Sequence, residues 1–374
     1  MFLKNLTLLI LILGSPYIFS QDKSYDSIKE GLKQPENVTI LYLIDQNLNT
    51  LPQEVLLFKN LKEIILDENI NLNLEQVFSI LAQFQHLKSL SLTDCNLNDL
   101  SSSIQLLSGL EELDLSGNNI TYFPEPIKTL KNLKTLDFFS TKMSELQFSN
   151  NDLANLEYIN LCYNNFETFP TDLGNLKSLK TIRIWANNLS VIPNNISKLK
   201  YVEEINLELN NISFFPKEFS QLESLQTLSL QGNKLDENSI SILYDIKRLE
   251  KLNLGGNRIN HLSSKIKQLT KLKYLNLSKN PITNIPMELK ELEHLEQLGL
   301  GGLSNMNWEN TFSILSEVKS LKRIGMFSMK KNKMPKGFKK LQQVDIFWLT
   351  FNSFNKEEQK RITKLTPNAT ITFN

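Results

Sequence analysis

A pattern of about 23 residues recurs along almost the whole chain, and this periodicity limits the possible folds more than any other feature. "LEELDLSGNNI" and "LKYLNLSKNPI" are its clearest copies. A stack of repeats shares one continuous core at any length, so we predict a single solenoid rather than the two or three domains that 374 residues suggest. Fourteen copies begin at Val38, Leu61, Leu87, Leu110, Leu133, Leu156, Leu179, Val202, Leu225, Leu249, Leu272, Leu295, Leu321 and Val344.

Each unit predicts one short strand followed by an inward turn. The fourth and sixth residues are apolar and alternate with polar ones, which is typical of a half-buried strand. The ninth residue is usually asparagine, which we expect to hydrogen-bond the backbone of the neighbouring turn. Cys95 and Thr141 replace it in two units, and Leu303 and Met329 interrupt the series near the end. The asparagines, called the ladder below, are Asn69, Asn118, Asn164, Asn187, Asn210, Asn233, Asn257, Asn280 and Asn352.

The second half of each unit predicts the opposite, convex side of the solenoid. Proline suits an extended segment and delays a helix, so units with proline at the fifteenth position are expected to carry short 3₁₀ or irregular turns. Three of the units without it resemble each other, and their apolar residues recur at spacings of three and four, which predicts true helices over residues 74–87, 237–249 and 309–321. Asn73 and Asn307 are suitable N-caps. The prolines are Pro52, Pro124, Pro170, Pro193, Pro216, Pro286 and Pro335.

The two ends differ from the repeats. Residues 1–20 combine one lysine, an apolar run and small residues, which predicts a secretory signal peptide, with an uncleaved membrane anchor as the alternative. An amphipathic helix is expected in an N-terminal cap over residues 21–37. The fourteen repeats then occupy residues 38–354. The C-terminal cap, residues 355–374, should hold a helix capped by Asn355, with Glu358 completing a capping box, and a last strand.

The repeat pattern resembles the leucine-rich repeat superfamily across residues 37–374. The resemblance implies an α/β fold: a curved horseshoe with a parallel concave sheet, 3₁₀ or short helices on the convex side, and helical caps at both ends. The motif is very specific for this fold. It is weakly specific for a ligand, because members share the scaffold and vary its face.

Residues capable of catalysis are sparse, and we expect no enzyme, no cofactor and no metal. The three histidines lie in different units without a metal-ligand partner at workable spacing. Gly299–Gly302 lie in a repeat strand, which does not suit a phosphate-binding loop. Cys95 and Cys162 fall three strands apart, about 14 Å at 4.8 Å per strand, so no disulfide is expected.

Binding has more support, from four consecutive units whose concave face carries large side chains. Their seventh residues are Phe139, Cys162, Trp185 and Glu208, where most units are small or polar. Exposed aromatic residues with an arginine are typical of protein-interface hot spots. The alternative is structural, because aromatic pairs also stabilise sheets and the rings could simply cover Cys162. The predicted partner-binding residues are Phe139, Tyr158, Tyr163, Arg183, Trp185, Glu208 and Leu209.

Charge is unevenly distributed along the chain. Residues 21–200 contain 15 Lys and Arg against 22 Asp and Glu, whereas residues 201–374 contain 25 against 18. Such a dipolar face can orient a charged partner. It is not the uniform basic stripe that nucleic acid requires, and beyond residue 20 no segment is apolar enough for stable membrane insertion.

Proline-bearing units of 23 residues, the predicted signal peptide and the "NKEEQKRITKLTPNATITF" tail resemble the exported leucine-rich repeat proteins of pathogenic spirochaetes such as leptospires. This resemblance implies a secreted or surface-associated protein that binds an extracellular or host protein on its concave face, with the periplasm as a second possible location. The alternative function is a self-associating scaffold of the envelope, and a homo-oligomer is compatible with either.

Overall fold

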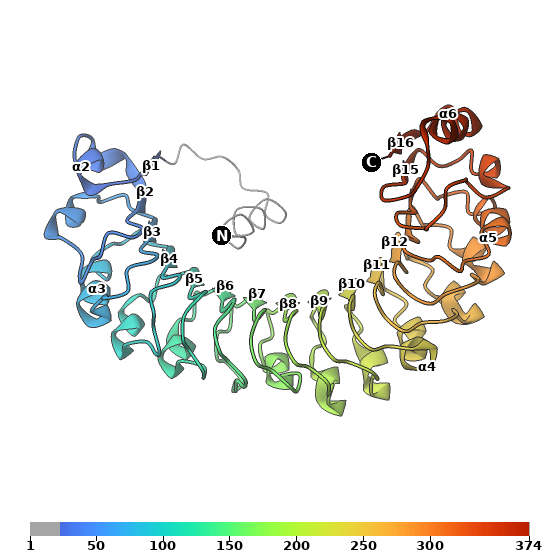
Figure 1. The fold of residues 1–374 in the computed structure, drawn as a ribbon. Coiled ribbons are helices and arrows are strands. Elements are labelled where there is room, and N and C mark those ends of the chain that lie inside the picture. Colours follow the sequence, from blue (N-terminus) through green and yellow to red (C-terminus); the bar gives the residue numbers. More distant parts are fainter. Residues whose placement is uncertain (1–22, 374) are drawn as a thin grey trace.

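The computed structural model describes residues 23–373, so the predicted signal peptide lies outside this part of the chain. Sixteen strands form one parallel sheet in sequence order, and they line the concave side of a horseshoe whose convex side carries the turns and helices (Figure 1). The predicted horseshoe solenoid is therefore confirmed. The strands are β1 Lys23–Tyr25, β2 Val38–Tyr42, β3 Glu63–Ile65, β4 Ser89–Ser91, β5 Glu112–Asp114, β6 Thr135–Asp137, β7 Tyr158–Asn160, β8 Thr181–Arg183, β9 Glu204–Asn206, β10 Thr227–Ser229, β11 Lys251–Asn253, β12 Tyr274–Asn276, β13 Gln297–Gly299, β14 Arg323–Gly325, β15 Ile346–Trp348 and β16 Thr370–Thr372.

Each of the fourteen units contributes one strand, from β2 to β15, and the register between them is constant. Leu136 pairs with Ile159, and Ile159 pairs with Ile182. These central residues are fully buried, while the residues on either side face the concave surface. Equivalent positions of successive units therefore form straight columns across the sheet, about 4.8 Å apart.

The asparagine ladder forms as predicted and ties each unit to the one before it. Nδ2 of Asn187 donates to the carbonyl oxygens of Leu161, 2.9 Å away, and Ile184, 3.2 Å away, and its Oδ1 accepts from the N–H of Phe166 at 3.1 Å. Cys95 and Thr141 also act as ladder residues: the Cys95 thiol donates to the Leu66 carbonyl, and the Thr141 hydroxyl bonds to Oδ1 of the next ladder asparagine. Backbone groups buried at the turns thereby find partners inside the protein.

The convex side is mostly 3₁₀ helix, as the prolines predict. Six of the seven prolines immediately precede a 3₁₀ helix, and near the seventh, Pro335, Gly337 takes that place. The 3₁₀ helices are Pro35–Asn37, Gln53–Leu57, Ser102–Leu106, Glu125–Thr129, Thr171–Asn175, Asn194–Lys198, Lys217–Gln221, Ser241–Asp245, Ser264–Gln268, Met287–Glu291 and Phe338–Lys340.

Two of the three predicted convex helices form with their predicted N-caps, but both end six residues before the predicted end. They are α3, Leu74–Leu81, where Asn73 accepts from the N–H of Gln76, and α5, Trp308–Leu315, where Asn307 accepts from the N–H of Asn310. The third prediction is wrong beyond Ile240, because α4 spans only Glu237–Ile240 and continues as the 3₁₀ helix Ser241–Asp245.

The N-terminal cap contains a helix, α2 Ile28–Gly31, that is a single turn. It is shorter than the amphipathic pattern predicts. The strand β1 precedes it and extends the sheet by one member that the repeat pattern does not show. The cap therefore combines a strand, one turn of α-helix and a short 3₁₀ helix.

The C-terminal cap consists of α6, Lys356–Leu365, and β16. Asn355 caps the helix as predicted, by accepting from the N–H of Glu358 at 2.8 Å. The predicted capping box is not formed, because the Glu358 carboxylate accepts from the N–H of Met334 at 2.7 Å and pairs with Arg361 at 2.6 Å. Glu358 thus ties the cap to the preceding unit. Among the described residues, no helix is long and apolar enough to cross a membrane.

Candidate functional site

Three rings from consecutive units meet at the middle of the concave face, and we call them the aromatic cluster: Phe139, Tyr163 and Trp185. Ring centroids are 5.1 Å apart for Phe139 and Tyr163, and 4.7 Å apart for Tyr163 and Trp185. The third pair, Phe139 and Trp185, is 6.2 Å apart. All three pairs are tilted or edge-to-face, and each such contact contributes about 0.5–1.5 kcal/mol beyond its buried area.

The cluster exists because Cys162 is small. Phe139 and Trp185 occupy the same column two units apart, a separation of about 9.6 Å between their strands. Their rings lean toward each other across the intervening Cys162, which is fully buried. Tyr163 nevertheless remains 43% exposed, and Phe139 and Trp185 are half-buried. The cluster therefore both covers a cysteine and presents aromatic surface to the concave side.

Tyr158 and Arg183 form a second pair beside the cluster. The guanidinium carbon of Arg183 lies 5.4 Å from the centroid of the Tyr158 ring, which is a cation–π contact. Burial raises the pKa of Tyr158, against the opposing effect of Arg183, so the phenol stays neutral at physiological pH. Arg183 is thus held in place by its neighbour.

Glu208 and Leu209 lie in the unit that follows Trp185. Oε1 of Glu208 accepts from the Ser229 hydroxyl and from Nδ2 of Asn253, 3.1 Å away, so its carboxylate is fixed toward the following units. Leu209 is 51% exposed and has a positive φ of 51°, which is unusual for a leucine. Of the seven predicted residues, three thus form the aromatic cluster and two form a cation–π pair, while Glu208 and Leu209 belong to the next unit. Their binding of a partner stays a prediction.

A network of carboxylates beside the cluster was missed by the sequence reasoning. Asp137 Oδ1 accepts from the N–H of Phe139 at 2.7 Å, and its Oδ2 accepts from Nδ2 of Asn160 at 2.9 Å. Ser116 connects Asp137 to Asp114. Burial, together with the nearby charge of Asp114, raises the pKa of Asp137 to about 7. The signal was present in the sequence: Asp114, Asp137 and Asn160 occupy the fifth position of consecutive units.

Two kinds of reactive group, metal ligands and thiols, bear on catalysis among the described residues. Between residues 23 and 373, no group of three His, Cys, Asp or Glu side chains is placed to hold a metal ion. The two thiols are buried and free, and burial raises the pKa of both, to about 11 for Cys95, so neither is an activated nucleophile.

Comparison with solved structures identifies proteins of similar fold. A leucine-rich repeat protein of Leptospira interrogans is 27% identical, with 94% of this chain and 100% of that chain covered and a TM-score of 0.74. An internalin of Listeria monocytogenes is 18% identical, with 92% of each chain covered and a TM-score of 0.61. A plant peptide hormone receptor in complex with its peptide is 20% identical, with 88% of this chain and 57% of that chain covered and a TM-score of 0.56. The last two show the fold alone.

Sequence comparison leads to the same fold. No curated protein sequence matches the chain. Models described as leucine-rich repeat match residues 85–100, 155–176, 177–235 and 247–305, and a model described as leucine-rich repeats in two copies matches residues 108–154. Together with the fourteen strands in constant register, these matches show that the chain belongs to the leucine-rich repeat family.

Proposed function

We propose that the chain is an exported, non-enzymatic protein-binding module that holds an extracellular or host protein on its concave face. The leucine-rich repeat fold is a protein-binding scaffold, and its neighbours in structure include a receptor and an internalin. The signal-like residues 1–20 support export, with the cell surface, the medium or the periplasm as the proposed destination.

The single observation that carries this proposal is the aromatic cluster. Three rings lie side by side on the open face of the sheet, where most equivalent positions are small or polar. Exposed aromatic rings supply large contact area at low entropic cost, which is why they dominate interface hot spots. Arg183, fixed over Tyr158, adds a charged donor at the edge of the cluster.

A triple variant tests the proposal. Phe139→Ala, Tyr163→Ala and Trp185→Ala should together abolish capture of extracellular host proteins by the immobilised chain, as quantified by mass spectrometry. The matched control is Tyr122→Ala, Tyr201→Ala and Phe214→Ala, which removes three rings that are 50%, 56% and 53% exposed and lie outside the strands. We expect the control to capture the same proteins as the wild type.

The same variants decide between binding and a purely structural role. If the cluster serves only to cover Cys162, the triple variant will melt much earlier than the control and will still capture the wild-type set of proteins. Capture that is lost while the melting temperature stays within a few degrees of the control supports the proposal.

Uneven charge favours a second candidate, a self-associating scaffold. The excess of seven acidic residues over residues 21–200 complements the excess of seven basic residues over residues 201–374. Two copies aligned head to tail would bring these halves together, with attraction that salt screens. Sedimentation velocity at rising concentration tests it: a monomer throughout, at both low and high salt, rules this candidate out.

A further inference from the structure

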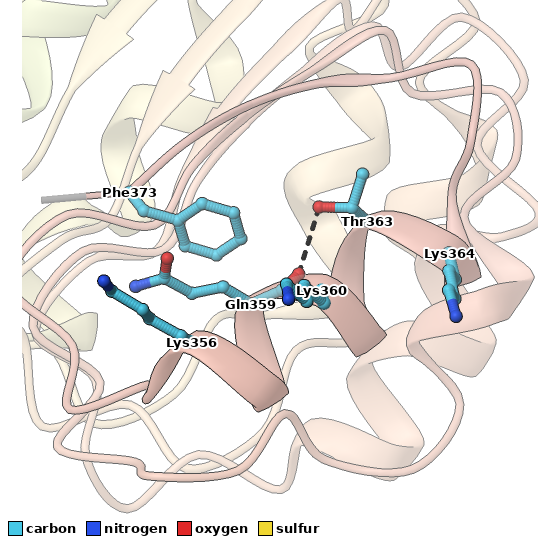
Figure 2. A pocket seen from close by; sticks show the side chains of 6 residues that line it. All are labelled: Lys356, Gln359, Lys360, Thr363, Lys364 and Phe373. Atoms are coloured by element: carbon cyan, nitrogen blue, oxygen red, sulfur yellow. Dashed lines mark hydrogen bonds between the residues drawn. The ribbon is translucent and has the colours of Figure 1, made fainter.

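A groove at the C-terminal end of the solenoid has a composition unlike that of the concave face. It has a volume of about 560 Å³ and is lined by Lys356, Gln359, Lys360, Thr363 and Lys364 of α6 and by Phe373, which follows β16 (Figure 2). The ring of Phe373 faces α6 across the groove, as Figure 2 shows. The groove therefore lies between the last helix and the last strand, at the far end of the horseshoe from β1 (Figure 1).

One side of this groove is formed by α6, and three of its lining residues are lysines whose aliphatic stems contribute to a mostly apolar surface. Lys356, Lys360 and Lys364 recur every four residues, so they lie on one face of α6 at intervals of about 6 Å. All three are exposed. Within residues 23–373, no ion pair is recorded for any of the three, although Arg361 of the same helix is paired with Glu358. Their charge is available to a partner.

Basic charge is concentrated in this end of the chain. Residues 330–374 contain ten Lys and Arg against three Asp and Glu. Residues 201–329 contain fifteen of each, so the whole positive excess of the second half lies in the last two units and the cap. An occupant of the groove is therefore expected to be acidic.

The other side of the groove adjoins an open edge of the sheet. Of the described strands, β16 is the last, and it pairs only with β15. The N–H of Thr370 donates to the carbonyl oxygen of Asp345, and the carbonyl oxygen of Thr372 accepts from the N–H of Leu349. Both of these backbone groups of β16 therefore point toward β15. Backbone groups alternate in direction along a strand, so the N–H and C=O of Ile371 face outward, where an added strand would pair.

We propose that this groove binds an extended acidic segment of a partner protein, which pairs with the edge of β16 and directs alternate carboxylates toward Lys356, Lys360 and Lys364. Alternate residues of a strand are about 6.6 Å apart, which matches the interval of about 6 Å between the lysines. Phe373 supplies an apolar contact beside them. A membrane surface fits less well, because three lysines in one line beside a concave groove do not form a flat basic plane.

A synthetic peptide with glutamate at alternate positions tests the proposal. Its dissociation constant for the full chain should rise at least tenfold with Lys356→Gln, Lys360→Gln and Lys364→Gln combined. The matched control is Lys333→Gln, Lys336→Gln and Lys339→Gln, which removes the same charge from the same end outside the groove and should change the constant less than twofold. Thermal melting confirms that both variants are folded.

Two further peptides separate strand addition from simple charge attraction. The first is N-methylated on alternate residues, so that it cannot pair with β16, and the second has the same composition with its glutamates in one block. We expect both to bind at least tenfold more weakly than the parent. Equal binding of either peptide, or equal lysine-dependent binding of anionic vesicles, would overturn the proposal. It would also be overturned if the groove lysines prove to mediate self-association in sedimentation instead of peptide binding.

Discussion

Asp114 and Asp137 share one hydroxyl group. Oγ of Ser116 lies 2.5 Å from Oδ1 of Asp114 and 2.9 Å from Oδ1 of Asp137. A hydroxyl carries a single proton, and an ionised carboxylate can only accept a hydrogen bond. The hydroxyl can serve both ionised carboxylates only through one bifurcated hydrogen bond, whereas protonation of one carboxyl group gives each contact its own proton. Geometry and the raised pKa of Asp137 thus indicate a proton held on the concave sheet near neutral pH.

This shared proton predicts that the folded chain is more stable at pH 5 than at pH 8. An unfolded aspartate loses its proton near pH 4, whereas folded Asp137 keeps it to about pH 7 and folded Asp67 to about pH 6. Between these values the folded state binds more protons, so the free energy of unfolding falls as the pH rises. We expect a loss of about 1–3 kcal/mol from these groups, measured by urea denaturation.

Asp114→Asn is the variant that isolates the pair. It removes the charge that raises the pKa of Asp137, while the amide oxygen can still accept from Ser116. The fall in unfolding free energy between pH 5 and pH 8 should shrink by roughly half, because one titrating partner and its repulsion are gone. If the unfolding free energy of the variant falls between pH 5 and pH 8 by as much as that of the wild type, the two carboxyl groups do not share a proton.

The asparagine ladder predicts that Asn187→Ala lowers the free energy of unfolding strongly, whereas Asn188→Ala, at the next residue, hardly changes it. Asn187→Ala removes the partners of the Leu161 and Ile184 carbonyls and of the Phe166 N–H, all in a buried environment. Unpaired buried polar groups cost about 1–3 kcal/mol each, so we expect a loss of about 2–4 kcal/mol. Asn188→Ala is the control, because that side chain is exposed, and it should change the urea midpoint little. Similar midpoints for the two variants would contradict this account.

Two glycines predict opposite responses to an added methyl group. A Cβ on Gly174 would lie 2.4 Å from Cβ and 2.9 Å from the carbonyl carbon of Lys198, so the turn of the next unit would have to move. Gly174→Ala should therefore destabilise the chain by about 1–3 kcal/mol. On Gly109 the nearest atom, the Leu87 carbonyl oxygen, would be 3.8 Å away. Gly109→Ala should be neutral or slightly stabilising in the same urea titration. If Gly174→Ala and Gly109→Ala lose the same amount of stability, Gly174 does not determine the spacing between neighbouring turns.

The aromatic cluster should shield the thiol of Cys162 from chemical labelling and should have no influence on the thiol of Cys95. Cys95 and Cys162 are both buried with raised pKa values, so neither should react with a thiol reagent at pH 8 before unfolding. Phe139→Ala with Trp185→Ala should expose Cys162 and speed its labelling at least tenfold, with Cys95 unaffected as an internal control. Labelling at the wild-type rate would show that the rings do not cover Cys162.

Much of the concave site was predictable because the repeat fixes columns. Once the units are aligned, Phe139 and Trp185 must stand in one column on the concave side, with Cys162 between them. The tilt of the rings across Cys162 was not predictable, since it depends on the space that one small side chain leaves. The direction of the Glu208 carboxylate was not predictable either, because it is held by Ser229 and Asn253, which lie on the following two strands.

The sequence alone determined the solenoid, its ladder and the position of most strands, because those features follow from local patterns copied fourteen times and each copy confirms the others. Only the tertiary structure decided what occurs once. It showed the added strand β1, the early end of α4, the hydrogen bond from Met334 to Glu358 and the Ser116 hydroxyl that contacts both Asp114 and Asp137. Each of these depends on hydrogen-bond partners from another unit or on burial, and neither a single copy of the repeat nor its period carries that information.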